Sequence, residues 1–168
     1  QFVTTSPDCL IRVFRFRTGK LRRVYDEGVE EAKKVQAGSN EDLKLESMDF
    51  GRRMAVEREY TSDLEAPGVN AVFDESGNFL IYPTLLGIKI VNLQSNSLAR
   101  VVGRVENTER FIKVALYQGM AKGKRTRNAE GEMKDVVKDP TIITCAFKKH
   151  RFYLFTKREP EDVEDASA

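Results

Sequence analysis

Residues 10–25 read LIRVFRFRTGKLRRVY, and this stretch decides the class of fold. Apolar and basic side chains alternate over residues 10–16, which is the period expected of a β-strand with one buried face. A turn follows around Gly19, because glycine takes a positive φ without steric cost. Residues 21–25 favour a second strand. The stretch therefore predicts a β-hairpin.

Further strands are predicted on both sides of this hairpin. Residues 2–6 precede it and end in a turn at Pro7 and Asp8. Gly77 and Gly87 are isolated turn glycines and form no phosphate-binding motif. Pro83 cannot donate a backbone hydrogen bond, so it indicates a bulge, a strand end or a sheet edge. The other expected strands cover residues 69–74, 79–82, 87–93, 98–102, 110–117, 141–147 and 152–155.

A helical segment interrupts the strands at residues 26–66. Glu, Lys, Arg, Ala and Met dominate it, and these are good helix formers. Residues 38–40 break the run, and Asn40 is a suitable N-cap for a helix over 41–60. Asp49 could instead cap a helix that starts there. Phe50 and Met54 are four residues apart and are expected to dock on one face.

Three segments can be superposed as the same strand of a repeating unit, namely residues 11–15, 88–92 and 152–156. A WD repeat is a four-stranded blade of about 40–45 residues whose third strand ends in Trp-Asp. Phe14-Arg15, Val91-Asn92 and Phe155-Thr156 occupy that place here, so the signature is degenerate.

The spacing of these three segments supports a repeat with insertions. Phe14 and Val91 are 77 positions apart (91 − 14), and Val91 and Phe155 are 64 apart (155 − 91). Subtracting about 42 residues for a standard repeat leaves roughly 35 and roughly 22. The helical segment and a polar loop at residues 118–138 account for these excesses. The predicted fold is all-β, consisting of WD-repeat β-propeller blades with an inserted helical segment.

This interpretation divides the chain into five parts. Propellers close with about four to eight blades, so the missing blades are expected from a longer protein. The chain also begins with Gln1 instead of Met, which is consistent with a fragment. The parts are a partial blade at 1–25, the insertion at 26–66, a full blade at 67–109, a further blade at 110–157 with a flexible basic loop at 118–138, and an acidic linker at 158–168.

Composition excludes several classes of function. A net charge of +2 with 32% charged residues argues against a strongly basic nucleic-acid binder. No apolar run approaches the length of a membrane span, and no signal peptide is visible. Cys9 and Cys145 are expected to be free thiols in a reducing compartment. With one histidine in the chain, we predict no metal site, no cofactor and no small-molecule substrate.

Five blocks spread along the chain carry a resemblance to a known family: FRF with TGKL at 14–21, DFGRRMAVE at 49–57, VFDE at 72–75, LGIK at 86–89 and FKKHRFY at 147–153. They are similar to the nuclear WD-repeat cyclophilins, which are peptidyl-prolyl isomerases with an N-terminal WD-repeat domain. The tail REPED at 158–162 resembles the linker before their cyclophilin domain.

The resemblance implies a nuclear protein whose propeller binds protein partners in the spliceosome or on chromatin. The cyclophilin domain would catalyse cis/trans rotation at X-Pro bonds, which is otherwise slow. Its Phe-His-Arg signature is absent here, and His150 is expected to be a solvated turn residue. We therefore expect no catalytic residue and no enzyme in this chain. Two alternatives are that the isomerase activity of the longer protein is the relevant function, with this part a tether, and that this part contacts RNA.

Several residues are candidates for contacts or turns. Arg52 and Arg53 could pin the helix to the propeller or face an acidic partner, or could lie on a solvated face paired with Glu57. Asp8 could brace a blade turn through backbone amides or form an ordinary Asx turn. A basic loop could touch RNA phosphates or an acidic protein, or merely aid solubility, and it lacks aromatics for base stacking. Its cations are Lys122, Lys124, Arg125 and Arg127.

Overall fold

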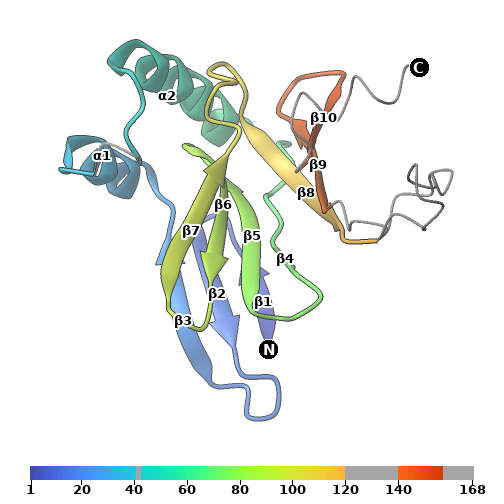
Figure 1. The fold of residues 1–168 in the computed structure, drawn as a ribbon. Helices are drawn as coiled ribbons and strands as arrows, with labels where there is room; N and C mark the ends of the chain where they lie inside the picture. Colours follow the sequence, from blue (N-terminus) through green and yellow to red (C-terminus); the bar gives the residue numbers. More distant parts are fainter. Residues whose placement is uncertain (41–42, 120–139, 157–168) are drawn as a thin grey trace, which may run out of the picture.

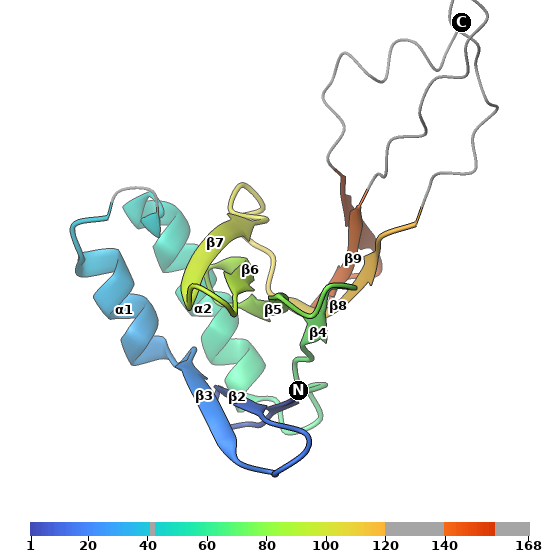
Figure 2. The same cartoon turned by 60° about the horizontal axis from the view of Figure 1, so that its bottom comes forward.

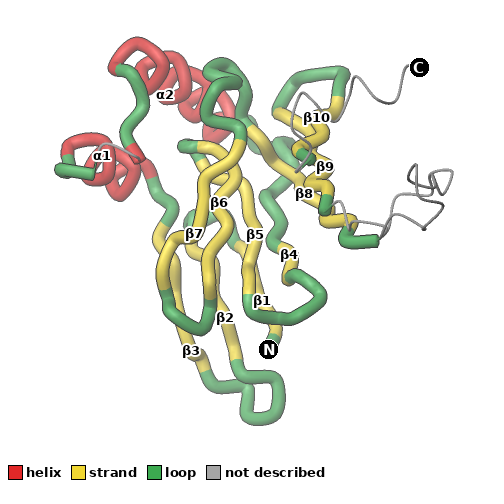
Figure 3. The backbone as a smooth tube through the Cα atoms, in the orientation of Figure 1, coloured by secondary structure: helices red, strands yellow, loops and turns green. Residues whose placement is uncertain are grey.

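The computed structural model describes residues 1–40, 43–119 and 140–156, which form three antiparallel sheets and two helices (Figures 1 and 3). Every strand expected from the sequence is present. The first sheet contains β1 (Phe2–Thr5), β2 (Leu10–Phe14) and β3 (Leu21–Asp26). The second contains β4 (Val72–Phe73), β5 (Phe79–Thr84), β6 (Gly87–Asn92) and β7 (Ser97–Val102). The third contains β8 (Phe111–Tyr117), β9 (Thr141–Ala146) and β10 (Phe152–Phe155).

Each sheet is a meander, in which strands that are consecutive in sequence pair antiparallel. None of the three closes into a barrel within the described residues. Pro83 lies one position before the end of β5, beyond the two residues through which β4 pairs with it. The strand-end reading of this proline is therefore confirmed. The assignment of the sheets to WD-repeat blades remains a prediction.

The strand β5, in the interior of the second sheet, is buried on both faces, and it organises the core. Leu80 and Tyr82 of β5 pack with Ile11 and Val13 of β2. Ile81 of β5 lies in a separate cluster with apolar residues of the third sheet. Successive side chains of a strand point to opposite faces, so β5 serves both clusters. This explains why its sequence is a continuous apolar run and not an alternation.

The two helices connect the first sheet to the second and lie together at one end of the sheets (Figures 1 and 2). They are α1 (Val29–Ala37) and α2 (Ser47–Ser62). Ala32 and Met54 bury their side chains against Leu85 and Leu86 in the β5–β6 turn. Phe50 packs beside them, so the predicted docking face is confirmed.

The second helix does not begin where the sequence predicted. We expected Asn40 to cap a helix over 41–60, but α2 begins at Ser47 and runs through Asp49 and Gly51 without a break. The side chain of Gln36 binds both backbone groups of Leu45, at 2.6 Å to its carbonyl and 3.0 Å to its amide. Those bonds and the burial of Leu45 hold the residues just before Ser47 outside the helix. A tertiary contact thus overrides helix propensity.

The predicted turn residues lie in turns. Asp8 accepts a hydrogen bond from the Leu10 amide at 3.0 Å, which is the local contact of an Asx turn. Its ion pair with Arg12 holds the pKa of the Asp8 carboxyl well below its usual range. Gly19, Gly77 and Gly87 all have positive φ. At Gly87 a Cβ would also lie 2.6 Å from the Val102 carbonyl oxygen, so only glycine fits without distortion.

Candidate functional site

A cavity of about 400 Å³ opens between the β1–β2 turn, the C-terminal end of α2 and the segment before β8. This volume is within the range of small-molecule and peptide side-chain sites. Its lining mixes apolar and polar groups. The residues that matter for its chemistry are Cys9, Glu27, Tyr60, Thr61, Pro83 and Arg110.

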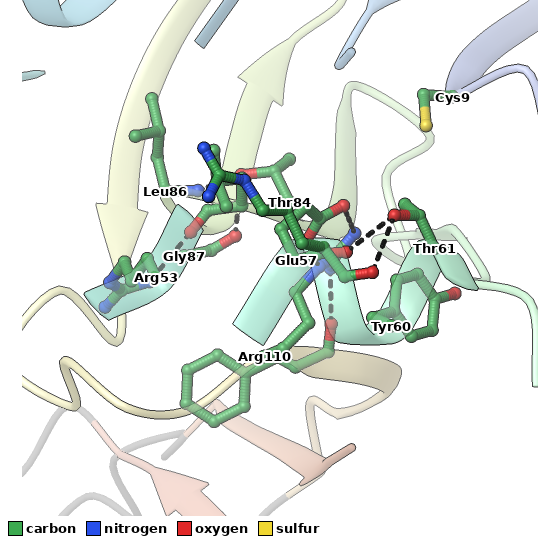
Figure 4. A network of polar contacts seen from close by, with 12 residues as sticks. Cys9, Arg53, Glu57, Tyr60, Thr61, Thr84, Leu86, Gly87 and Arg110 are labelled. Carbon is green, nitrogen blue, oxygen red and sulfur yellow. Dashed lines mark hydrogen bonds and ion pairs between the residues drawn. The ribbon is translucent and has the colours of Figure 1, made fainter. Parts of the chain in front are cut away.

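Arg110, which lines the cavity, forms a buried ion pair with Glu57 (Figure 4). Arg110 donates to both carboxylate oxygens of Glu57, through Nε to Oε2 and through Nη2 to Oε1 at 3.3 Å. Its Nη1 donates to the Phe111 carbonyl at 2.7 Å, and its guanidinium lies 4.9 Å from the centre of the Tyr60 ring. The two charged side chains are only 7% and 3% exposed. Each charge therefore depends on the other for compensation.

Arg53 lies one helical turn before Glu57 and is 2% exposed. Its guanidinium donates to backbone carbonyls, including Leu85 at 3.0 Å and Gly103 at 2.6 Å (Figure 4 shows its position beside Gly87). Burial lowers the pKa of Arg53 to about 10, which still leaves it a cation at neutral pH. The side chain pins α2 to the β5–β6 turn and to the loop after β7.

This burial corrects one part of the sequence analysis. Arg53 has no exposed guanidinium to offer a partner, because its Nη atoms are used by main-chain oxygens. Arg52 is exposed and lies 3.4 Å from Asp49 on the same helix, so its role in partner binding remains a prediction. Glu57 pairs with Arg110 and not with either of these arginines. Adjacent arginines therefore have different environments.

The lining of the cavity is arranged for binding more than for covalent chemistry. Burial raises the pKa of the Cys9 thiol, which keeps it protonated at neutral pH and weakens it as a nucleophile. Glu27 accepts from the Tyr82 hydroxyl at 2.9 Å and from Lys89 Nζ at 2.6 Å. Over residues 1–40, 43–119 and 140–156, no three His, Cys, Asp or Glu side chains are grouped as a metal site.

The structure places the remaining predicted residues as follows. His150 is exposed in the β9–β10 turn, and both cysteines are free and partly buried. The four basic residues of the 118–138 loop, Lys122, Lys124, Arg125 and Arg127, lie outside the described residues, as does the tail from 158. No helix in the described part of the chain has the length and apolarity to cross a membrane.

Sequence reasoning missed the Glu57–Arg110 pair. The two residues are 53 positions apart, and no spacing rule joins charges at that distance. The one local signal was Arg110 itself, a charged residue directly before the apolar strand that starts at Phe111.

Comparison with known proteins finds relatives whose names agree with one another. Peptidyl-prolyl cis-trans isomerase CYP71 of Arabidopsis thaliana is 56% identical over 173 residues, which cover 99% of this chain and 27% of that protein. Peptidylprolyl isomerase domain and WD repeat-containing protein 1 of Homo sapiens is 43% identical over 176 residues, covering 100% of the chain and 26% of the relative. Peptidyl-prolyl cis-trans isomerase cyp15 of Rhizopus delemar is 43% identical over 170 residues, which cover 96% and 27%. No protein-family model matches the sequence.

These relatives confirm the resemblance at the level of homology and contradict one prediction. The chain spans about 27% of the length of the curated relatives it matches. We expected a chain that is not part of the enzymatic region, yet the relatives that cover it almost completely are named as peptidyl-prolyl isomerases or as proteins with such a domain. The absence of a short catalytic signature was therefore not sufficient to classify the chain as non-enzymatic.

Proposed function

We propose that this chain is part of a peptidyl-prolyl cis-trans isomerase that also contains WD repeats, and that isomerisation of X-Pro bonds by the whole protein is its function. The observation that carries this proposal is 56% identity to an isomerase over nearly the entire chain. The uncatalysed rotation takes tens to hundreds of seconds, so a cellular protein that accelerates it has a measurable effect.

The first prediction concerns that activity. The complete protein should accelerate the cis/trans interconversion of a Pro-containing peptide well beyond the spontaneous rate. The measurement is an isomerisation assay by NMR exchange or a protease-coupled readout, run in parallel on the complete protein and on these 168 residues. A complete protein that leaves the spontaneous rate unchanged would refute the proposal, and the parallel assay measures the share of activity that these residues carry.

We also propose that the three sheets are WD-repeat blades within that longer protein. Support comes from the meander topology, from sheets stacked face to face through two apolar clusters, and from the WD repeats named in one relative. The outer face of the third sheet is apolar and open. Its large exposed apolar side chains are Tyr117, Ile143, Phe152 and Leu154, and Lys113 is exposed beside them. A further sheet of the longer protein would bury these side chains.

Cys145 offers a test of this arrangement, because it lies on β9 opposite Phe152 on β10 and is partly exposed. In a Cys9→Ser background, alkylation of Cys145 by a thiol reagent should be several-fold slower in the complete protein than in the 168-residue chain. The physical reason is coverage of the sheet face by the next sheet. Equal alkylation rates would mean that no neighbouring sheet covers this face.

The assembly in which this protein acts is part of the same proposal. The resemblance in the sequence points to the nucleus and to protein partners of the spliceosome or of chromatin. In this proposal the blades hold the isomerase beside its proline-containing substrates. A pull-down with the complete protein from nuclear extract, followed by mass spectrometry, distinguishes splicing factors from chromatin proteins.

A further inference from the structure

The β2–β3 hairpin carries a group of cations that no acidic side chain of residues 1–40, 43–119 and 140–156 neutralises. Between residues 9 and 25 the chain has no acidic residue. The exposed cations at the tip have no ion pair within the described residues, although such pairs are common elsewhere on this surface. These cations are Arg15, Arg17, Lys20 and Arg22.

The basic turn between β9 and β10 shows the contrast. In the β9–β10 turn, Lys148 Nζ lies 2.7 Å from Glu59. Lys149 and Arg151 both lie within 4.0 Å of Glu109, at 3.8 and 3.1 Å. That turn is electrostatically compensated, whereas the four cations at the tip of the β2–β3 hairpin form no ion pair with any residue that the structure describes. Although the whole chain is nearly neutral, the fold concentrates uncompensated positive charge in one place.

An exposed aromatic ring lies between these cations. Phe16 is 76% exposed, in sequence between Arg15 and Arg17. Its ring contacts Phe2 edge-on, with centroids 6.4 Å apart, and Phe2 stacks on Phe14 at 4.9 Å. The two other rings therefore support one side of Phe16 and leave the rest of its surface open to solvent.

The hairpin is rigid enough to present these groups together. The Arg15 amide donates to the Lys20 carbonyl at 2.9 Å, and the Gly19 amide donates to the Arg15 carbonyl at 2.9 Å. Gly19 has a φ of +62°, which permits this tight closure. Figure 1 shows the hairpin extending beyond the rest of the first sheet, away from the helices. Little ordering is then required when a ligand binds.

We propose that the tip of the β2–β3 hairpin, residues 15–22, binds single-stranded nucleic acid. The four cations would contact phosphates, and Phe16 would stack on a base. Unpaired cations combined with an exposed aromatic are the features that proteins use to hold single strands without sequence preference. The Asp and Glu side chains of an acidic peptide would pair with the cations but offer Phe16 no ring to stack on, whereas every nucleotide carries both a phosphate and a base. The aromatic ring therefore favours nucleic acid.

The test measures binding of a fluorescent oligouridine of about ten nucleotides by anisotropy, using the full 168-residue chain. Replacing Arg15, Arg17, Lys20 and Arg22 by Gln should weaken binding roughly tenfold or more, and should reduce the slope of log affinity against log salt by about 3. Phe16→Ala should weaken binding roughly tenfold, whereas Phe16→Tyr should preserve it, because stacking requires only a ring. Circular dichroism melting shows whether each variant folds.

The matched control removes the same charge elsewhere, through replacement by Gln of four exposed lysines that already pair with carboxylates, namely Lys33, Lys34, Lys148 and Lys149. This variant should bind the oligouridine nearly as well as the unaltered chain. An equal loss in both quadruple variants would overturn the proposal, since net charge alone would then explain binding. So would full affinity in Phe16→Ala, the absence of any binding, or displacement of the RNA by polyglutamate as readily as by unlabelled RNA.

Discussion

Replacing Glu57 by Ala should lower the free energy of unfolding by about 3–5 kcal/mol, since the change leaves Arg110 buried without its partner. The carboxylate accepts two hydrogen bonds from that guanidinium, and both side chains are almost fully buried. Urea unfolding followed by far-UV circular dichroism measures the loss. Circular dichroism is the suitable probe because the chain contains no tryptophan.

Glu59→Ala is the matched control for this prediction. Glu59 is on the same helix and lies 2.7 Å from Lys148, but both side chains are more than half exposed. Loss of such a surface pair should cost at most about 1 kcal/mol. The double variant Glu57→Leu with Arg110→Met should recover much of the stability, because an apolar pair can replace a buried ion pair. Similar losses for Glu57→Ala and Glu59→Ala would contradict the burial described above.

Arg53→Met should destabilise the chain by about 3–4 kcal/mol. The guanidinium satisfies four carbonyl oxygens, and the shorter apolar side chain leaves them without this donor in a buried place. Two of these bonds, to Arg104 and Glu106, lie at 3.1 and 3.2 Å in addition to those to Leu85 and Gly103. Urea unfolding measures the change. We also expect faster hydrogen exchange at residues 103–106, because the loop loses its attachment to α2.

Arg52→Met supplies the comparison at the adjacent position. Arg52 is exposed and makes only contacts within its own helix, to Asp49 and to the sulfur of Met48, so its loss should change stability by no more than about 0.5 kcal/mol. If the two substitutions cost the same, then Arg53 does not anchor the helix. The pair of variants thus separates an anchoring arginine from a surface arginine within one dipeptide.

The outline of the three sheets could be predicted because strand signals are local. Alternation in residues 10–16 encodes a strand with one buried face, and it appears as β2 with Ile11 and Val13 buried. The turn at Gly19 could be predicted in the same way, since its positive φ suits few residues other than glycine. The start of α2 could not be predicted. It depends on Gln36 holding Leu45, a contact across nine positions that propensity does not describe.

The charges of the proposed binding surface show the same difference between what is local in sequence and what depends on folding. Composition indicated a nearly neutral chain, but it could not indicate that acidic partners neutralise the β9–β10 turn, whereas the cations at the tip of the β2–β3 hairpin have no ion pair in the described part of the chain. Those pairings depend on which segments lie side by side after folding.

The sequence alone determined the strands, the helical insertion and the turn glycines, because these depend on residues that are neighbours in the chain. It also determined the relationship to isomerases with WD repeats, because that depends on residues that align with those of the relatives. Only the tertiary structure decided that Arg53 is an anchor while Arg52 is exposed, and that Glu57 meets Arg110. The physical reason is that the energy of a charge depends on its burial and its partners, and packing brings those partners together from distant parts of the chain.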